Sequence, residues 1–188
     1  MELEQTLKQY GVLKEGHFRL TSGLHSGQYF EKFRILEHPE LVTQFAAKIA
    51  DEFRKQGITI VCGPTTGGVI IAFEVARQLD ARCVVAEKTE PSGRKIGRGF
   101  EIGPADRILV VDDVLTTGGS ITDTLAALTQ FGGKVAGIAV FIDRSAQSPF
   151  SIPLFAVYRK AVQNYQPDDC PLCKSGIPLA VPGSTGKK

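Results

Sequence analysis

The chain of 188 residues lacks an apolar run of the roughly 18 to 20 residues that a membrane-spanning helix requires. Its first residues, Met1 to Gln5, are acidic and contain no signal-peptide core, so we expect a cytoplasmic protein. An excess of one charge is also missing, because 22 Lys and Arg stand against 20 Asp and Glu. This balance gives no reason to expect nucleic acid or a membrane as a partner. A hydrophobic content of 43% suffices for one domain with a full core and a small appendage.

Segments with strand character alternate with segments of helical spacing along most of the chain. The run 108–111 is apolar and β-branched, as in a strand buried on both faces, and the apolar residues of 121–131 recur at helical spacing. This alternation predicts an α/β fold, in which helices flank a mainly parallel, twisted sheet. In chain order we expect helix 2–10, hairpin 18–36, helix 39–56, strand 58–62, helix 69–79, strand 82–86, strand 107–112, helix 120–131, strand 134–142 and strand 153–158.

Two adjacent carboxylates lie where an apolar strand ends, in the run from Val110 to Thr122. They are Asp112 and Asp113, and hydroxyls and glycines follow them before the next helix, namely Thr116, Thr117, Gly118, Gly119 and Ser120. In an open α/β sheet, ligands bind beyond the carboxyl ends of the strands, where the following helix offers backbone N–H groups to a phosphate. Because two carboxylates would repel a phosphate, we expect them to bind sugar hydroxyls or a hydrated Mg²⁺ that the substrate carries. The run therefore predicts a site for a sugar phosphate, with ribose as the natural sugar.

The same run has a plainer interpretation as an ordinary connection from strand to helix. Its acids would then be solvated, and its Thr and Ser side chains would cap the helix. A cap needs one oxygen, whereas two acids, three hydroxyls and two glycines fall within nine positions here. A nucleotide-binding P-loop is excluded, because Gly-x-x-x-x-Gly-Lys followed by Ser or Thr does not occur in the chain.

A glycine-rich turn and a basic segment add groups that suit an anion. The turn from Gly63 to Gly68 connects an expected strand to an expected helix, so that its backbone N–H groups are able to face a diphosphate, and Pro64 would stiffen the approach. Between two strands, four cations lie among glycine, serine and proline, which is the composition of a lid that closes over an anion: Lys88, Arg94, Lys95 and Arg98. The alternative is a solvated basic hairpin.

Two further segments suit a planar, acidic base. Ser22 and Gly23 indicate a turn in a short hairpin, and Tyr29 and Phe30 would offer a flat face to a heterocycle. The alternative makes both rings core aromatics. Arg144 follows Asp143 at the end of an expected strand, and its guanidinium matches a planar carboxylate with two parallel hydrogen bonds. An Asp-Arg sequence at a strand end is otherwise a common surface pair of little energetic value.

Together these segments resemble the orotate branch of the type I phosphoribosyltransferases. The run 110–122 is similar to the signature for phosphoribosyl pyrophosphate (PRPP), and the run 17–30 looks like the amino-terminal motif Phe-x-Leu-x-Ser-Gly of orotate phosphoribosyltransferases. The resemblance implies the type I fold, with a small hood made of the amino-terminal hairpin and the carboxyl-terminal tail. It implies that N1 of orotate displaces pyrophosphate from C1 of PRPP, giving orotidine 5′-monophosphate in pyrimidine (UMP) biosynthesis. It also implies Mg²⁺ as cofactor and a homodimer in which the basic loop reaches the neighbouring subunit's site.

The resemblance further assigns roles to single residues. Catalytic roles fall to Asp113, Lys88 and Lys95. PRPP would be bound by Asp112, Asp113, Val114, Leu115, Thr116, Thr117, Gly118, Gly119, Ser120, Lys88, Arg94, Lys95, Arg98, Thr65 and Thr66. Orotate would be bound by Thr116, Arg144, Tyr29, Phe30 and Ser22. No residue would ligate Mg²⁺ directly, because the ion arrives with PRPP and would reach Asp112 and Asp113 through water. The loop at 63–68 would bind pyrophosphate and often contains a non-proline cis peptide in the family.

The chain departs from the family pattern in its basic loop. Many orotate enzymes have an Arg-Lys pair, a second Lys and a His-Gly there, but this chain has no histidine after His38. Gly67 and Thr21 also stand where some members have lysine. Four cations remain, so a branch with a shorter loop explains the pattern.

The tail at 163–188 differs from the main domain at 1–162, whose hood we expect in about 1–36. It is rich in proline and contains Cys170 and Cys173 with a spacing that suits half of a zinc site or a redox pair. Since Cys62 and Cys83 lie in or beside expected core strands, we favour two reduced thiols or a local disulfide, and a zinc site shared across a dimer stays open. We expect the tail to pack on the hood or on a partner subunit, and 183–188 to be disordered.

Two rival functions use the same scaffold. A phosphoribosyltransferase for adenine, xanthine or another base would share the acidic run but not the hairpin motif or Arg144. A non-catalytic regulator that senses PRPP would be expected to lack the loop cations or to add a basic nucleic-acid-binding module.

Overall fold

The structure is a computed structural model that describes residues 2–20 and 22–182. The chain divides into a sheet unit, His38–Lys160, and a hood unit, which combines Met1–Glu37 with Ala161–Lys188. The hood unit thus takes its residues from both ends of the chain. Two expectations lie outside the described residues: the one for Thr21 and the one for 183–188.

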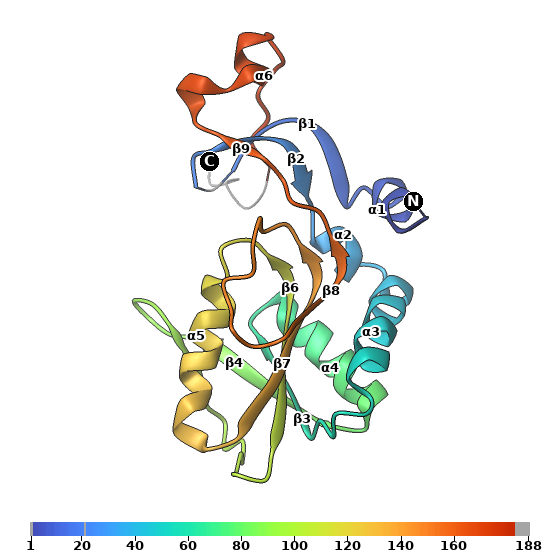
Figure 1. Ribbon diagram of the computed structural model, residues 1–188, viewed down its shortest axis with the longest axis vertical. Coiled ribbons are helices and arrows are strands. Elements are labelled where there is room, and N and C mark those ends of the chain that lie inside the picture. Colours follow the sequence, from blue (N-terminus) through green and yellow to red (C-terminus); the bar gives the residue numbers. More distant parts are fainter. Residues whose placement is uncertain (1, 21, 183–188) are drawn as a thin grey trace. The chain divides into compact units, whose positions relative to one another are not determined.

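The sheet unit contains a six-stranded sheet with the order β5-β4-β3-β6-β7-β8 (Figure 1). Its strands are β3 (Ile60–Pro64), β4 (Arg82–Lys88), β5 (Arg94–Ile96), β6 (Arg107–Leu115), β7 (Lys134–Asp143) and β8 (Leu154–Arg159). β4 and β5 pair antiparallel, whereas the other neighbours pair in parallel. Parallel pairing brings the carboxyl ends of β3, β4, β6 and β7 to one edge of the sheet, the place where ligands bind in open α/β folds. The predicted fold class is confirmed.

Helices cover both faces of this sheet. α3 (Pro39–Phe53) and α4 (Gly67–Leu79) pack on one face, and α5 (Gly119–Leu128) packs on the other (Figure 1). Phe45 of α3 meets Phe141 of β7 edge to face, with ring centroids 5.2 Å apart. On the opposite face, Ile121 and Leu128 of α5 join the buried side chains of the central strands. Ile108–Val111 of β6 are fully buried between these layers, and each such side chain contributes about 1.5–3 kcal/mol of hydrophobic stabilisation.

Two strand boundaries differ from the sequence expectation, and in both cases pairing explains the difference. β6 was expected to end at Asp112, but it continues to Leu115, because the longer β7 offers partners there, with Leu115 opposite Asp143. β5 was expected within a loop, but Arg94 pairs with Lys88 of β4. The basic segment is therefore a hairpin rather than an open loop.

The hood unit is built on a three-stranded sheet of order β1-β2-β9. β1 (Leu13–Arg19) and β2 (His25–Phe30) form the expected hairpin, and β9 (Asn164–Tyr165) adds the tail to β2. At the hairpin turn, Gly23 has φ 85° and its N–H donates to the Leu20 carbonyl at 2.9 Å, which confirms the predicted turn. Short helices complete the unit: α1 (Glu2–Gln9), α2 (Phe33–Leu36), the 3-10 helix η2 (Pro167–Asp169) and α6 (Pro171–Lys174).

The tail continues past α6 and returns to β1, where Ala180 forms a parallel bridge with Phe18. The Arg19 N–H donates to the Ala180 carbonyl at 2.9 Å, and the Ala180 N–H donates to the His17 carbonyl at 2.8 Å. The tail is thus hydrogen-bonded to both edges of the hairpin, so that hairpin and tail form one unit.

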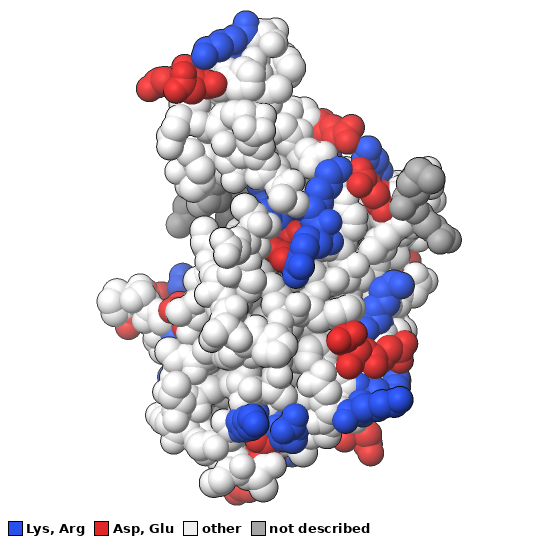
Figure 2. All heavy atoms as spheres, viewed as in Figure 1, with Lys and Arg blue, Asp and Glu red and all other residues white. Residues whose placement is uncertain are grey.

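Charged side chains on the viewed surface stand in mixed groups, with Lys and Arg beside Asp and Glu (Figure 2). Exposed pairs include Arg54 with Asp51 at 2.9 Å and Arg77 with Glu74 at 2.7 Å. Such exposed pairs each contribute about 0–1 kcal/mol. Among the described residues, no helix has both the length and the hydrophobicity needed to cross a bilayer.

Candidate active site

The two adjacent acids lie inside the last part of β6, three and two residues before its end, and not in the loop after it. Both are nearly buried, Asp112 at 7% and Asp113 at 6% exposure. Backbone groups fix them, because the Asp113 N–H donates to Oδ1 of Asp112 at 2.9 Å and the Val114 N–H donates to Oδ1 of Asp113 at 2.7 Å. The carboxylates are therefore held by the strand itself, which limits their rotation.

The turn after β6 runs from Thr116 to Gly118 and leads directly into α5. Thr116 and Thr117 are exposed, and Gly118 adopts φ 83°. A Cβ at Gly118 would lie 2.8 Å from Cζ of Phe150, so both the backbone angle and the space require glycine. Helix geometry leaves the first N–H groups of α5 without an acceptor inside the helix, and these groups face the turn.

The capping interpretation of this turn does not hold. The N-cap position of α5 is Gly118, and no described side chain forms a cap hydrogen bond there. Ser120 instead accepts a hydrogen bond from Nη2 of Arg94 at 2.9 Å. The hydroxyls of the run are thus available for roles other than capping.

The glycine-rich turn at 63–68 lies against the acids. A Cβ at Gly68 would be 3.2 Å from Oδ1 of Asp112 and 2.6 Å from Cδ of Pro64, so only glycine permits this approach. The peptide bond between Thr65 and Thr66 is cis, as the family resemblance implied. The Thr65 N–H donates to the Ala86 carbonyl at 3.0 Å, which ties the turn to β4.

Arg94 connects the turn 63–68 to the start of α5. Its Nη1 donates to Oγ1 of Thr65 at 3.2 Å and to the Ala86 carbonyl at 3.1 Å, and its Nη2 donates to Ser120. Its Nε is buried and has no hydrogen-bond partner among the described residues. A buried guanidinium donor without an acceptor costs about 1–3 kcal/mol, and a ligand oxygen would recover that energy. Arg94 therefore lies between the two turns, and its Nε–H is available to donate a hydrogen bond to a ligand.

The other three cations of the hairpin have different surroundings. Nε of Arg98 donates to Oε1 of Glu87 at 2.5 Å, so its charge is paired within the hairpin. Lys88 and Lys95 are exposed. Since side chains alternate along a strand, Lys95 points to the face opposite Arg94. Lys88 pairs with Arg94, and its N–H donates to Oγ1 of Thr65 at 3.3 Å. Of the four predicted cations, Arg94 and Lys88 therefore lie beside the turn 63–68, and the side chain of Arg94 contacts both turns.

Arg144 lies directly beside the turn of β6. Its N–H donates to the Leu115 carbonyl at 3.1 Å, so Arg144 and Thr116 each follow one of two hydrogen-bonded strand ends. Arg144 and Thr116 are therefore neighbours at the same edge of the sheet, and their role in binding a base stays a prediction. Asp143, at 2% exposure, accepts a hydrogen bond from Nε of Arg159 at 2.9 Å. Local sequence gives no signal for Arg159, because its approach to Asp143 depends on the parallel pairing of β7 with β8.

The residues expected to hold the base in the hood unit have unequal positions. Ser22 is exposed in the turn. Phe30 is 5% exposed and pairs with Leu13, whereas Tyr29 is half-buried, with its ring centroid 5.7 Å from that of Phe18. Neighbouring residues of a strand point to opposite faces, so Tyr29 and Phe30 do not form one flat surface. The expectation of a paired face is therefore corrected, and Phe30 has the position of a core aromatic.

Comparison with known proteins decides the family. The family model for the phosphoribosyl transferase domain matches residues 33–171. The orotate phosphoribosyltransferase of Caldanaerobacter subterraneus subsp. tengcongensis is 40% identical over 188 residues, which is 98% of this chain and 98% of that protein. The chain belongs to the orotate phosphoribosyltransferase family.

Other orotate phosphoribosyltransferases agree with this assignment. The protein of Chlorobaculum parvum is 42% identical over 178 residues, or 94% of this chain and 92% of that protein. The crystal structure of orotate phosphoribosyltransferase from Aeropyrum pernix matches with a TM-score of 0.70 at 25% identity, covering 84% of this chain and 93% of that chain. The likeness therefore extends over the sequence and over the type I phosphoribosyltransferase fold.

Proposed function

We propose that this protein is an enzyme that transfers the 5-phosphoribosyl group of PRPP to orotate, giving orotidine 5′-monophosphate and pyrophosphate in pyrimidine biosynthesis. The C1–oxygen bond to pyrophosphate breaks, the bond from C1 to N1 of orotate forms, and the N1 proton is released. The family assignment supports the reaction. One structural observation supports the location of the PRPP site. The buried acids of β6 lie close to two glycine-containing turns, 63–68 and 116–120, and Arg94 is hydrogen-bonded to both turns.

Asp112 and Asp113 suit the ribose ring of PRPP. Their carboxylate oxygens accept hydrogen bonds from the 2′- and 3′-hydroxyls, and their backbone contacts hold them ready for this task. The turn 116–120 suits the 5′-phosphate, because its hydroxyls and the N-terminus of α5 offer donors and a positive dipole end. Acids for the sugar and donors for the phosphate thus follow one another within the nine residues 112–120.

The turn 63–68 and Arg94 suit the pyrophosphate of PRPP. As in glycoside cleavage, the transition state is expected to be oxocarbenium-like, with negative charge growing on the departing pyrophosphate. The guanidinium of Arg94 stabilises that charge from a partly buried position, where it acts more strongly than in water. Carboxylate oxygens also suit hydrated Mg²⁺, so Asp112 and Asp113 would hold it through water when it arrives with PRPP, where it neutralises leaving-group charge.

Arg144 and Thr116 suit orotate. The guanidinium fork of Arg144 forms two parallel hydrogen bonds with the orotate carboxylate, a group that adenine and xanthine lack. Its fixed position next to Leu115 keeps it close to the ribose site. The base-binding roles of Tyr29 and Ser22, and the cytoplasmic location, stay predictions.

Lys95 supplies catalytic charge across a homodimer in this proposal, whereas Lys88, which pairs with Arg94 and lies on the same face, acts at the site of its own chain. Arg94 faces the turns of its own chain, and alternation along β5 directs Lys95 the other way. A cation that points away from its own site is suited to the site of a second copy. One face of the β4–β5 hairpin, which carries Arg94, therefore serves the site of its own chain, and the opposite face, which carries Lys95, serves the site of the partner chain.

A panel of bases tests the reaction. Pyrophosphate release from PRPP is measured with orotate, adenine and xanthine, and we expect turnover with orotate alone. Turnover with adenine or xanthine but not orotate would contradict the base assignment. Binding of RNA or DNA at physiological salt, without turnover of any base, would favour the regulator.

Mixing of two inactive variants tests the shared hairpin. Asp113→Asn damages the ribose site, and Lys95→Ala damages the hairpin. After the two proteins are unfolded together and refolded, mixed dimers contain one site with both residues intact, so we expect about one quarter of wild-type activity. A mixture as inactive as the separate variants would show that Lys95 acts within its own chain. A chain that elutes as a monomer would contradict the dimer itself.

A further inference from the structure

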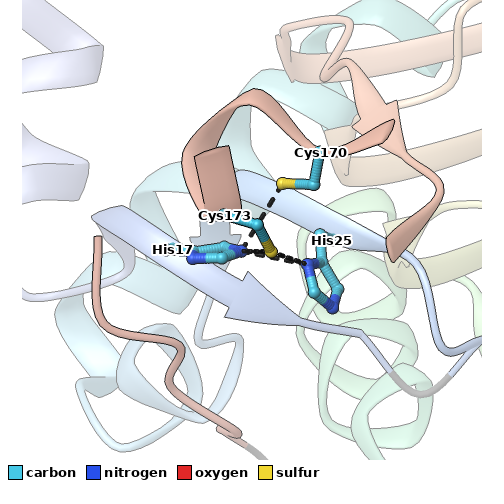
Figure 3. A group of neighbouring side chains, drawn as sticks. All are labelled: His17, His25, Cys170 and Cys173. Carbon is cyan, nitrogen blue, oxygen red and sulfur yellow. Dashed lines mark hydrogen bonds between the residues drawn. The ribbon is translucent and has the colours of Figure 1, made fainter. Parts of the chain in front are cut away.

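Four metal-ligating side chains meet in the hood unit: His17 of β1, His25 of β2, Cys170 and Cys173. Figure 3 shows the two imidazoles projecting from the hairpin toward the cysteines of the tail segment around α6. His17, His25 and Cys170 are buried at 3%, 5% and 0% exposure, and Cys173 is exposed. Both cysteines are free thiols, so among the described residues the structure has the first of the two expected alternatives, reduced thiols, and not the local disulfide.

The spacing of these four side chains fits a tetrahedral zinc ion. Zinc with Zn–N bonds of about 2.0 Å and Zn–S bonds of about 2.3 Å places its ligand atoms roughly 3.3–3.8 Å apart. Nε2 of His17 lies 3.0 Å from Nδ1 of His25, and 3.5 and 3.7 Å from Sγ of Cys170 and Cys173. Nδ1 of His25 lies 3.3 Å from Sγ of Cys173, and all four ligand atoms lie within 4.8 Å of one another. These four separations need shifts of a few tenths of an ångström around an ion, and a pair at the 4.8 Å limit would have to close by about 1 Å.

The protonation of His17 also fits a metal ligand. Its Nδ1 lies 2.8 Å from the carbonyl oxygen of Ile177, and because a carbonyl only accepts, Nδ1 carries the proton. Nε2 is then the nitrogen with the free electron pair, and it is the one that faces the cysteines. A histidine that ligates zinc commonly donates its other N–H to a backbone carbonyl in this manner, which fixes the ring.

We propose that His17, His25, Cys170 and Cys173 bind one structural Zn²⁺ within a single chain. Two imidazoles and two thiolates form a complete tetrahedral set, which leaves no open position for a substrate, so the site is structural rather than catalytic. The donor set also excludes Mg²⁺, which prefers oxygen ligands. Since all four ligands belong to one chain, the zinc site shared across a dimer that the sequence left open is unnecessary.

The hood unit has a physical need for such a cross-link. Its buried apolar side chains are few: Leu7, Val12, Leu13, Phe18, Phe30, Ile35 and Cys170. In the tail, Ile177, Leu179 and Val181 are exposed at 40%, 42% and 46%, so hydrophobic burial does little to hold this segment. Small units with a limited core commonly rely on a metal or disulfides for stability. A Zn²⁺ ion would cross-link the tail to the hairpin, because two of its ligands belong to each segment.

Metal analysis of the full chain tests the site. The protein is purified without chelator from zinc-supplemented cells and analysed by mass spectrometry of metals, and we expect about one zinc per chain. Replacement by Co²⁺ should give the visible bands of tetrahedral cobalt together with a thiolate-to-cobalt charge-transfer band. A protein that holds no stoichiometric zinc, that holds iron instead, or that contains a disulfide between Cys170 and Cys173 overturns the proposal.

Matched cysteine variants locate the ion. Cys173→Ser should lose the zinc and the charge-transfer band, whereas Cys83→Ser, in β4 of the sheet unit, should keep both. Trypsin reports the structural role in the wild-type protein, because removal of zinc by a chelator should speed cleavage after Lys174 by about tenfold or more. Equal zinc in Cys173→Ser and wild type, or unchanged cleavage on zinc removal, contradicts the proposal even if a variant folds poorly.

Discussion

Replacement of Arg94 by glutamine should selectively damage the use of PRPP. The substitution removes the guanidinium that joins Thr65 of one turn to Ser120 of the other. Hydrogen bonds to a charged group contribute about 1.5–3 kcal/mol each, but the three bonds share one side chain and are not additive. We therefore expect a loss of about 2–3 kcal/mol of transition-state stabilisation, which is a fall of about 30- to 150-fold in kcat/KM for PRPP.

Initial rates of pyrophosphate release, with PRPP and orotate varied in turn, measure this effect. The KM for orotate should change by less than about threefold, because Arg94 contacts the turns and not the base site. Arg54→Gln is the matched control, since Arg54 is exposed at the end of α3 and paired with Asp51. A change of less than threefold in kcat/KM for PRPP in Arg94→Gln would refute the bridging role of this cation.

Three further predictions concern other parts of the sheet unit. Arg144→Ala should raise the KM for orotate by about tenfold to a hundredfold and that for PRPP far less, and equal effects on both would contradict the carboxylate contact. Gly118→Ala should lower the free energy of unfolding by about 2–3 kcal/mol in denaturant titrations, because φ 83° and the ring of Phe150 both oppose a Cβ; a loss below about 0.5 kcal/mol would contradict this. The hydrogen bond from Arg77 lowers the pKa of Glu74 from 4.5 to about 2, so the pair stabilises the fold above pH 4.5 and loses this effect as pH falls toward 2. Glu74→Gln should therefore lower the free energy of unfolding at pH 7 in denaturant titrations, by at most about 1 kcal/mol because Arg77 is exposed, and should have almost no effect below pH 2; a constant difference across this range would exclude the linkage.

Local patterns were sufficient to predict the centre of the site. An apolar run followed by two acids, and hydroxyls followed by glycines, have only a few physical interpretations. The structure places Asp112 and Asp113 in the last four residues of β6 and Gly118 in the turn that follows, close to where these patterns predicted them. The alternation of strands and helices likewise predicted the sheet and its helical faces. These features depend on residues that are neighbours in sequence.

Features that depend on distant partners were not predictable in the same way. The last residues of β6 become strand because β7 pairs with them, and β5 is a three-residue edge strand whose Arg and Lys resemble loop residues. The link from Arg94 to Ser120 joins residues 26 positions apart.

The histidines of the proposed zinc site were missed for the same reason. They lie about 150 residues from the cysteines, and β1 carries a bulge between Glu15 and Phe18 near His17. One signal was available: two histidines in a hairpin and a Cys-x-x-Cys tail together supply four zinc ligands.

A crystal structure of the protein with Mg²⁺ and PRPP bound tests the central claim most directly. We predict that oxygens of Asp112 and Asp113 lie within hydrogen-bond distance of the 2′- and 3′-hydroxyls, with the 5′-phosphate on the turn 116–120. PRPP bound with its ribose away from both carboxylates would contradict the account.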